Sequence, residues 1–365
     1  MSSPRKIRFT GEIIAVSPMS ITVFRDKTDR TPNYGIPMLT VTEESGGVSH
    51  VATVPGYNFK GALRRRALQV VRDALAKAGN DIAIDLEAYY LNAIGGVKGS
   101  EKEDVRNILR MRALRDANPI LGLFGAATPH FMQGCLSVSF ATAQPDSYKL
   151  YNEKGVRVDD VRRRPALLTE LAGDPIEEYA SYVEDRAEVR EQKSKVTAFA
   201  AKLAAARKAG DAEARANLQA EQDVEQKKLD EMNAESGAQI MRPIERLGIS
   251  PGAQFLQTMT LDSPTDAELG LLLDALKRFA SSCRLGGLES IGFGQIKASW
   301  VIEEIDPTNL QKERIGTVQI SDCEFDADLS HPTLRRAIDA WSAYVSAPEK
   351  IALTPAALEQ VIAAR

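Results

Sequence analysis

The amino-acid sequence predicts an α+β fold, and three observations lead to this prediction. Four segments are rich in alternating or β-branched apolar residues, which is the pattern of strands with one buried face. Two segments between them have apolar residues at every third or fourth position, which is the pattern of amphipathic helices. A long stretch rich in Ala, Glu, Lys and Gln interrupts this series in the middle of the chain. The expected structure is a core of strands and helices with a helical insertion.

The first part of the chain is predicted to form a strand, a loop and a helix. Residues 5–16 have the composition of a strand with one apolar side. The segment 17–50 is rich in Pro, Gly and Thr and is predicted to be a long loop. After Pro55 the period becomes helical and continues to Gly79, which is a typical C-terminal stop.

The middle of the chain contains the insertion. Residues 81–117 are predicted to hold further helices, and residues 135–143 alternate as a second strand. Residues 170–236 have mixed charge and little Gly or Pro, which predicts a helical hairpin with its turn near Gly210-Asp211. The apolar stripe of this hairpin is thin, so we expect it to project from the core.

Regular structure resumes with a strand at 253–261, a helix at 265–281 and a strand at 295–303. Taken in order, the elements follow β-α-β-β-α-β, which is the order of the ferredoxin-like fold and of RNA-recognition (RRM-like) domains. Residues 305–365 add a strand candidate at 316–320 and two helices, so a C-terminal extension outside that core is expected.

Composition excludes several classes of protein. The chain has 365 residues, of which 44% are hydrophobic and 26% charged, so it is neither disordered nor collagen-like. Its three cysteines form no Cys-x-x-Cys pair and it has three histidines, so we expect no disulfide framework, metal centre or cofactor. No P-loop, H-E-x-x-H or G-x-S-x-G motif occurs. Without a signal-peptide core or a long apolar segment, a cytoplasmic protein with no membrane partner is expected.

Charge is unevenly distributed along the chain. Residues 1–72 hold eleven Lys or Arg against five Asp or Glu, although the whole chain has a formal charge of −4. A basic segment can bind a polyanion even in an acidic protein, because phosphate contacts are local. The alternative is a solvated surface with uneven charge, which is common.

The segment Pro55-Gly-Tyr-Asn-Phe-Lys-Gly-Ala-Leu-Arg-Arg-Arg66 suggests the clearest chemistry. Asn58 is predicted to cap the helix, so that the first amide N–H groups face an anion. Lys60 and Arg64 lie four residues apart on one face and would complete a phosphate cradle. The alternative is a basic, solvated first turn, although cations near a helix N-terminus oppose its dipole.

Two further segments are candidate contacts. The glycine-rich loop 285–294 follows a helix and precedes a strand, the reverse of a Rossmann turn. Its glycines would let a ligand approach the backbone, or it could be only a tight connection. The segment Val156–Arg164 is rich in arginine and could line a nucleic-acid groove or be a solvated linker.

Together these segments resemble the RAMP superfamily, specifically the backbone subunits of CRISPR effector complexes (the Cas-seven type). The matching segments are Ile7–Val16, Val54–Arg64 with its Pro-Gly-x-x-x-Lys-Gly-x-Leu-Arg element, Leu123-Phe-Gly125, Met241–Arg246, the strand and helix at 253–281, and Gly286–Gly294. The resemblance does not cover 81–116, most of 165–236 or 305–365. Among subtypes, the chain is most similar to the type IV (Csf-two) backbone protein in overall size and insertions.

The resemblance implies that copies of the chain stack head-to-tail on one guide RNA and present it for target pairing. It implies an RRM-like palm at 1–144 and 243–304 with a finger insertion at about 81–117, a thumb at 145–242 and an extension at 305–365. It implies guide contacts at Asn58, Lys60, Arg64, Arg65, Arg162, Arg163, Arg164, Arg242, Gly287, Ser290 and Gly292. It also implies other CRISPR effector subunits, a DNA target and a helicase as partners. With 6% aromatic residues, we expect a backbone grip made by cations and amides, not by stacking platforms.

Two alternatives remain at this point. In type III relatives, an aspartate in the loop after the first strand cleaves target RNA, and Asp26 and Asp29 lie in that loop here without the expected surrounding pattern. These acids could bind a divalent cation, or they could be turn residues. The other alternative is a protein-interaction scaffold that works through the arm at 170–236. We expect a binding subunit and not an enzyme.

Overall fold

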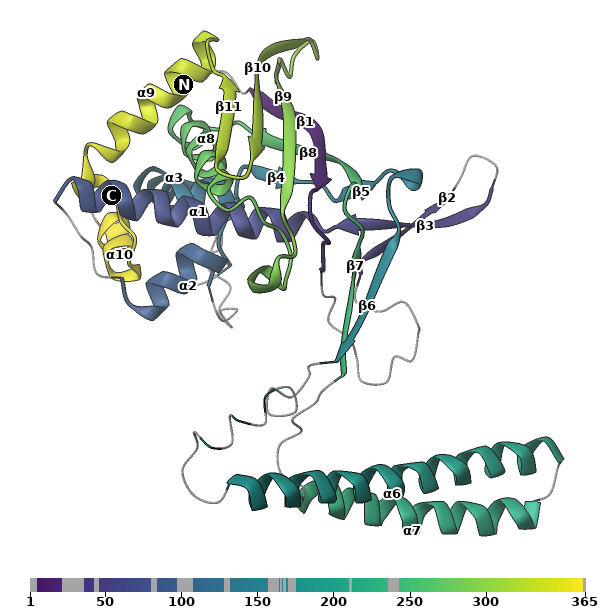
Figure 1. Ribbon diagram of the computed structural model, residues 1–365. Coiled ribbons are helices and arrows are strands. Elements are labelled where there is room, and N and C mark those ends of the chain that lie inside the picture. The colour runs from purple at the N-terminus through teal and green to yellow at the C-terminus, as the bar shows by residue number, and fades with distance from the viewer. Residues whose placement is uncertain are drawn as a thin grey trace. The chain divides into compact units, whose positions relative to one another are not determined.

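An antiparallel sheet is the frame of this protein, shown as a computed structural model in Figure 1. The structure describes residues 5–21, 36–42, 46–79, 84–96, 108–127, 132–156, 164, 166, 169, 175–209, 212–235 and 243–363. The strands of this sheet are β1 (Lys6–Ala15), β2 (Met38–Thr42), β3 (Val48–Val54), β4 (Leu136–Val138), β5 (Ala141–Ala143), β8 (Gln254–Asp262), β9 (Ile296–Ile305), β10 (Lys312–Ser321) and β11 (Glu324–Asp328). They are ordered β11-β10-β9-β1-β8-β5-β3-β2, and β4 also pairs with β8.

Strand β1 lies between β8 and β9 and pairs antiparallel with both. Phe9 lies opposite Met259 on one side and Ile302 on the other. Ile7, Phe9 and Ile13 are fully buried, because alternate side chains of a strand point to the same face. The predicted first strand and its apolar side are confirmed.

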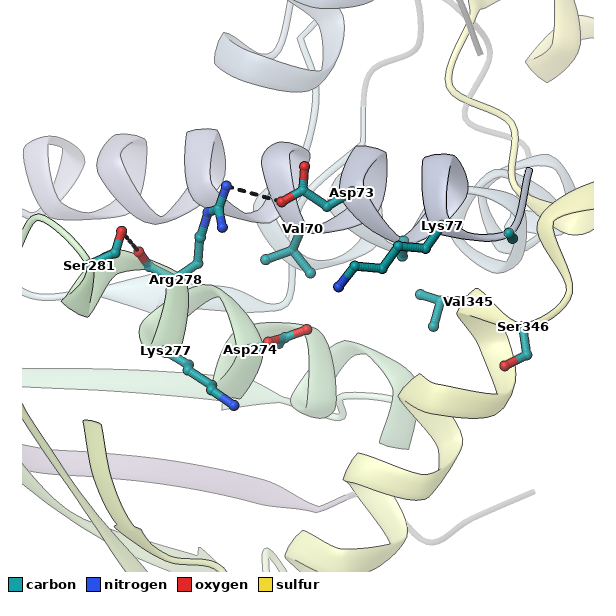
Figure 2. A pocket seen from close by; sticks show the side chains of 11 residues that line it. Val70, Asp73, Lys77, Asp274, Lys277, Arg278, Ser281, Val345 and Ser346 are labelled. Carbon is teal, nitrogen blue, oxygen red and sulfur yellow. Dashed lines mark hydrogen bonds and ion pairs between the residues drawn. The ribbon is translucent and has the colours of Figure 1, made fainter. Parts of the chain in front are cut away.

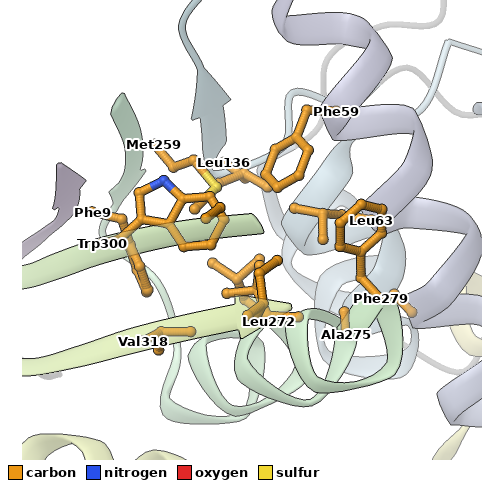
Figure 3. Packing of buried hydrophobic residues seen from close by; sticks show 14 of the residues in the cluster. Phe9, Phe59, Leu63, Leu136, Met259, Leu272, Ala275, Phe279, Trp300 and Val318 are labelled. Carbon is orange, nitrogen blue, oxygen red and sulfur yellow. The ribbon is translucent and has the colours of Figure 1, made fainter. Parts of the chain in front are cut away.

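Helices pack on the apolar face of the sheet and on one another. They are α1 (Gly56–Lys77), α2 (Leu86–Ile94), α3 (Ile108–Ala117), α4 (Pro119–Phe124), α8 (Asp266–Ala280), α9 (Pro332–Val345) and α10 (Pro355–Ala363). Figure 3 shows Phe59 of α1 beside Trp300 of β9 and Phe279 of α8, with ring centroids 5.8 Å and 5.5 Å from Phe59 respectively. All three side chains are buried, and each aromatic side chain of this size contributes roughly 1.5–3 kcal/mol on burial. The predicted α+β class is confirmed.

Part of the predicted loop at 17–50 is wrong. Strands β2 and β3 form an antiparallel hairpin, and Thr53 and Val54 extend β3 onto β5. The strands are short, so their own sequence carries a weak signal, and hydrogen bonds to neighbouring strands determine their conformation. Residues 22–35 lie outside the described residues.

The C-terminal extension completes the fold. Strands β10 and β11 widen the sheet beyond β9, and α9 lies so close to α8 that a Cβ on Gly270 would clash with the backbone of Ala337. The side-chain amide of Asn92 donates a hydrogen bond to the Leu353 carbonyl at 2.7 Å, and that of Asn118 donates to the Ala352 carbonyl at 3.0 Å. The predicted strand at 316–320 and both C-terminal helices are confirmed.

The chain divides into two units, Met1–Asn152 with Arg246–Arg365 and Glu153–Glu245, which we call the body and the arm. The arm contains the helices α6 (Pro175–Ala209) and α7 (Ala212–Glu235), which pack as a hairpin on either side of Gly210-Asp211, as predicted. A separate two-stranded ribbon, β6 (Leu150–Val156) and β7 (Pro243–Ile249), has no counterpart in the sequence predictions. The predicted thumb limits, 145–242, stay a prediction.

The two helices of the arm meet along a single seam. Leu203 and Leu229 are its buried apolar residues, at 6% and 7% exposure. Along the described part of this seam a polar layer lies between the two leucines, next to Leu229, in which the Gln192 amide donates hydrogen bonds to the Glu225 carbonyl at 3.1 Å and carboxylate at 2.6 Å. A buried polar layer of this kind fixes the register of two helices at some cost in stability.

Candidate nucleic-acid interface

The glycine-rich loop at 286–294 is anchored to the segment that follows β1. The Gly287 amide donates a hydrogen bond to the Ser20 carbonyl, and the Gly294 amide donates to the Pro18 carbonyl, both at 2.8 Å. At Gly286, with φ of +95°, a Cβ would lie 2.3 Å from the Ser20 oxygen, so only glycine fits there. The base of the loop is therefore fixed by backbone contacts.

The tip of this loop is exposed. A single 3₁₀ turn at Glu289–Ile291 is closed by Gly292, whose φ is +91° and whose missing Cβ would meet open space. Ser290 is exposed on this turn, and Gly287 is half-buried at its base. The tip can therefore admit a ligand close to the backbone, and the assignment of Gly287, Ser290 and Gly292 to RNA stays a prediction.

Helix α1 begins earlier than the sequence predicts. Its N-cap is Pro55, no side chain caps its first turn, and the Asn58 amide donates to the Pro55 carbonyl at 2.9 Å. The predicted capping role of Asn58 is wrong, because the helix already starts at Gly56 and Asn58 lies within the first turn. Asn58 is half-buried there and remains a candidate contact.

Arg64 is a structural residue, which corrects the predicted guide contact. Its side chain is 6% exposed, and its guanidinium donates three hydrogen bonds of 2.6–2.7 Å to the carbonyls of Leu91, Asn92 and Gly125. Burial lowers the pKa of this guanidinium to about 10. Arg64 therefore satisfies the C-terminal carbonyls of α2 and one loop carbonyl, and its donors face the interior.

Lys60 is also directed toward the protein. Its ammonium donates a hydrogen bond to the Leu136 carbonyl of β4 at 2.7 Å, and the residue is half-buried. Burial lowers the pKa of Lys60, and the neighbouring charge of Arg64 lowers it further. The predicted phosphate cradle of Lys60 and Arg64 is therefore wrong in its geometry, because this face of α1 is covered by β4 and α2.

Arg66 joins α1 to the glycine-rich loop. Its guanidinium donates a hydrogen bond to the Ser282 hydroxyl at 2.6 Å, just before the loop begins, and another to Gln69 at 3.0 Å. Burial lowers the pKa of Arg66, and the carboxylate of Glu289 at the loop tip acts in the opposite direction. Arg66 is the last residue of the Arg-Arg-Arg run, and its sequence pattern did not predict it as a guide contact.

Arg65 is exposed beside Arg66, and no hydrogen bond or ion pair holds its guanidinium within the described ranges. Its nearest recorded neighbour is Gly61, where a built Cβ would lie 3.6 Å from the Arg65 Nη1 atom. Of the three basic residues predicted on α1, Arg65 is thus the one whose charge faces solvent. It stays a predicted guide contact.

The remaining predicted residues lie in the arm or outside the described residues. Arg164 is exposed, in a part of the arm described only at isolated positions. Arg162, Arg163, Arg242, Asp26 and Asp29 lie outside the described residues. Among the residues that the structure does describe, no three His, Cys, Asp or Glu side chains are grouped so as to hold a metal ion.

A second concave surface lies between α1, α8 and the end of α9. This groove of about 660 Å³ has Val70 and Val345 among its apolar residues (Figure 2). Its two acids already have partners, because Asp73 pairs with Arg278 at 3.0 Å and Asp274 accepts a hydrogen bond from Trp341 Nε1 at 3.1 Å. Charges of both signs line the groove, so it does not select one class of ligand.

No protein-family model and no curated protein sequence matches the chain. Among solved structures, the chain is similar to a chain of a type IV-B CRISPR complex, with 18% identity and a TM-score of 0.41 over 83% of this chain and 92% of that one. It is also similar to Thermofilum pendens Csc2, with 11% identity and a TM-score of 0.35 over 98% of this chain and 89% of that one. Within the described ranges, every helix is too short or too polar to cross a lipid bilayer.

Proposed function

We propose that this chain is a guide-RNA-binding backbone subunit of a multi-subunit CRISPR effector complex, without a catalytic role of its own. The observation that carries the proposal is the contact between Arg66 and Ser282. It joins α1 to the segment that leads from α8 into the glycine-rich loop, although the two residues are 216 positions apart in the sequence. Both segments belong to the motif set on which the resemblance rests, and together they offer cations and accessible backbone to a phosphate chain.

The arrangement of the body supports a ferredoxin-like palm. The four strands of the expected βαββαβ series are β1, β4 with β5, β8 and β9, and they are neighbours in the order β9-β1-β8-β5. Helices α1 and α8 pack against each other through Phe59 and Phe279 on one face of the sheet. In the proposed assembly, copies stack head-to-tail in a type IV-like complex that targets DNA with a helicase as partner.

The test is the RNA content of the full chain purified from cells that express its guide array. Wild-type protein should carry protected RNA of defined length and elute as oligomers. Arg65→Glu should lose most of this RNA, because it reverses an exposed charge on α1 without disturbing a buried contact. Arg335→Glu, an exposed arginine of α9, is the charge-matched control and should keep the RNA.

Two results would contradict the proposal. One is an RNA-free, folded monomer from cells that contain the guide. The other is an equal loss of RNA in Arg65→Glu and Arg335→Glu, which would indicate a non-specific charge effect. Deletion of the arm at 175–235 that removes a protein partner but leaves RNA binding unaffected would add a scaffold role.

A further inference from the structure

An exposed aromatic residue stands at the start of α1, where sequence analysis expected only cations and amides. Tyr57 is 67% exposed, and no ring contact or hydrogen bond engages its side chain among the described residues. An aromatic side chain normally stabilises a protein by being buried, so a largely exposed one in the first turn of a helix contributes little to the fold. Its position next to the proposed RNA site calls for another explanation.

The residues that follow Tyr57 on the same side of the helix have complementary properties. Tyr57, Gly61 and Arg65 are spaced four residues apart, so they succeed one another along one side of α1. Gly61 has no side chain and leaves this strip of helix open, since a Cβ there would meet only the Arg65 guanidinium. The Arg65 Nη1 atom lies 3.6 Å from the position of that Cβ, so the exposed positive charge of Arg65 lies about one helical turn from Tyr57.

A second exposed aromatic lies on the segment packed against the start of α1. A Cβ on Gly56 would lie 2.2 Å from the Val138 oxygen and 2.9 Å from the Ser139 oxygen, so the helix start and the β4–β5 connection touch. Phe140 follows directly and is 47% exposed. The N-terminal end of α1 therefore carries aromatic surface on two adjoining segments.

We propose that Tyr57 stacks on an unpaired nucleobase of bound single-stranded RNA, while Arg65 contacts a phosphate of the same strand across the open strip at Gly61. A flat ring with a cation about one helical turn away matches a nucleotide, whose base is apolar and planar and whose phosphate is anionic. The inference rests on the proposed function and adds a base contact to the backbone grip.

The test compares a short single-stranded RNA with an abasic strand of the same length and charge, using the full chain in a binding titration. Tyr57→Ala should weaken binding of the RNA at least about fivefold and leave binding of the abasic strand unchanged, because stacking requires the base. Tyr57→Phe should retain the wild-type affinity, and Tyr57→Leu should not restore it. Tyr89→Ala, at a tyrosine of α2 that is 41% exposed, is the matched control and should have no effect.

The salt dependence of binding distinguishes the proposed phosphate contact of Arg65 from the proposed base contact of Tyr57. Arg65→Ala should lower the slope of log affinity against log salt by about one, and Tyr57→Ala should leave the slope unchanged. Equal loss on both strands in Tyr57→Ala would overturn the inference and indicate a protein contact. Full RNA binding by Tyr57→Ala would overturn it and leave the proposed function standing. Wild-type protein that binds neither strand would overturn both.

Discussion

The body and the arm of this protein are stabilised by different kinds of contact. In the body, aromatic residues far apart in the sequence, such as Phe59, Phe279 and Trp300, meet in one core. In the arm, the buried seam residues Leu203 and Leu229 come from two consecutive helices. Loss of one contact in the body should therefore weaken the whole sheet and its helices, whereas loss of one contact in the arm should weaken the hairpin alone.

The tryptophans make this comparison measurable. The chain has two, Trp300 and Trp341, and both belong to the body. Tryptophan fluorescence therefore follows unfolding of the body, while far-ultraviolet circular dichroism also follows the long helices of the arm. A variant that affects one unit will separate the two signals.

The largest loss of stability is expected from substitution of Arg64. Arg64→Met should lower the free energy of unfolding of the body by about 3 kcal/mol, because three buried carbonyls lose their donors. Urea unfolding followed by tryptophan fluorescence measures the change. The neighbouring variant Arg65→Met is the control and should stay within about 0.5 kcal/mol of wild type, because that side chain is exposed. Equal effects of the two variants would contradict the buried role of Arg64.

An intermediate effect is expected in the arm. Leu203→Ala removes the best-buried apolar side chain among the described residues of α6 and should destabilise the hairpin by about 2 kcal/mol. The helix signal in circular dichroism should decrease at a lower urea concentration than in the wild type, and the fluorescence transition should stay unchanged. If both transitions shift together, the arm and the body unfold as one cooperative unit, and the hairpin is not stabilised independently of the body.

The smallest expected change in the free energy of unfolding is a gain in stability, at Gln257. Gln257 on β8 is 2% exposed, and neither its amide nitrogen nor its amide oxygen has a hydrogen-bond partner. Gln257→Met keeps the side-chain length and removes these two groups, so the body should gain about 1 kcal/mol of stability. A higher midpoint in thermal unfolding followed by tryptophan fluorescence is the expected result. Destabilisation would mean that the amide has a partner, such as a buried water.

Elements with a strong periodic pattern were predictable from the sequence. The strand at 5–16, the helix after Pro55 and the helix at 265–281 carry their burial pattern in consecutive residues, and the helical hairpin was predictable from its composition. Strands β2 and β3 were missed because a short strand gains its hydrogen bonds from neighbours that are distant in the sequence. The role of the C-terminal extension was missed for the same reason.

The candidate site was predictable in its segments and not in its individual residues. Helical spacing correctly placed Lys60 and Arg64 together, but it could not show which other elements cover that side of α1. Leu136 and the end of α2 occupy it, so the two cations are turned inward. Arg65 and Arg66, one and two positions further, face solvent and the glycine-rich loop respectively.

The sequence by itself determined the α+β class, the strand and helix periods, the hairpin insertion and the two segments that form the candidate interface. These properties depend on residues that are near one another in the chain, so a local pattern contains them. Only the tertiary structure decided which arginine is buried, how the glycine-rich loop meets α1 and that Tyr57 is left exposed. Each of these depends on packing between segments that the chain brings together from far apart, and such packing leaves no local pattern in the sequence.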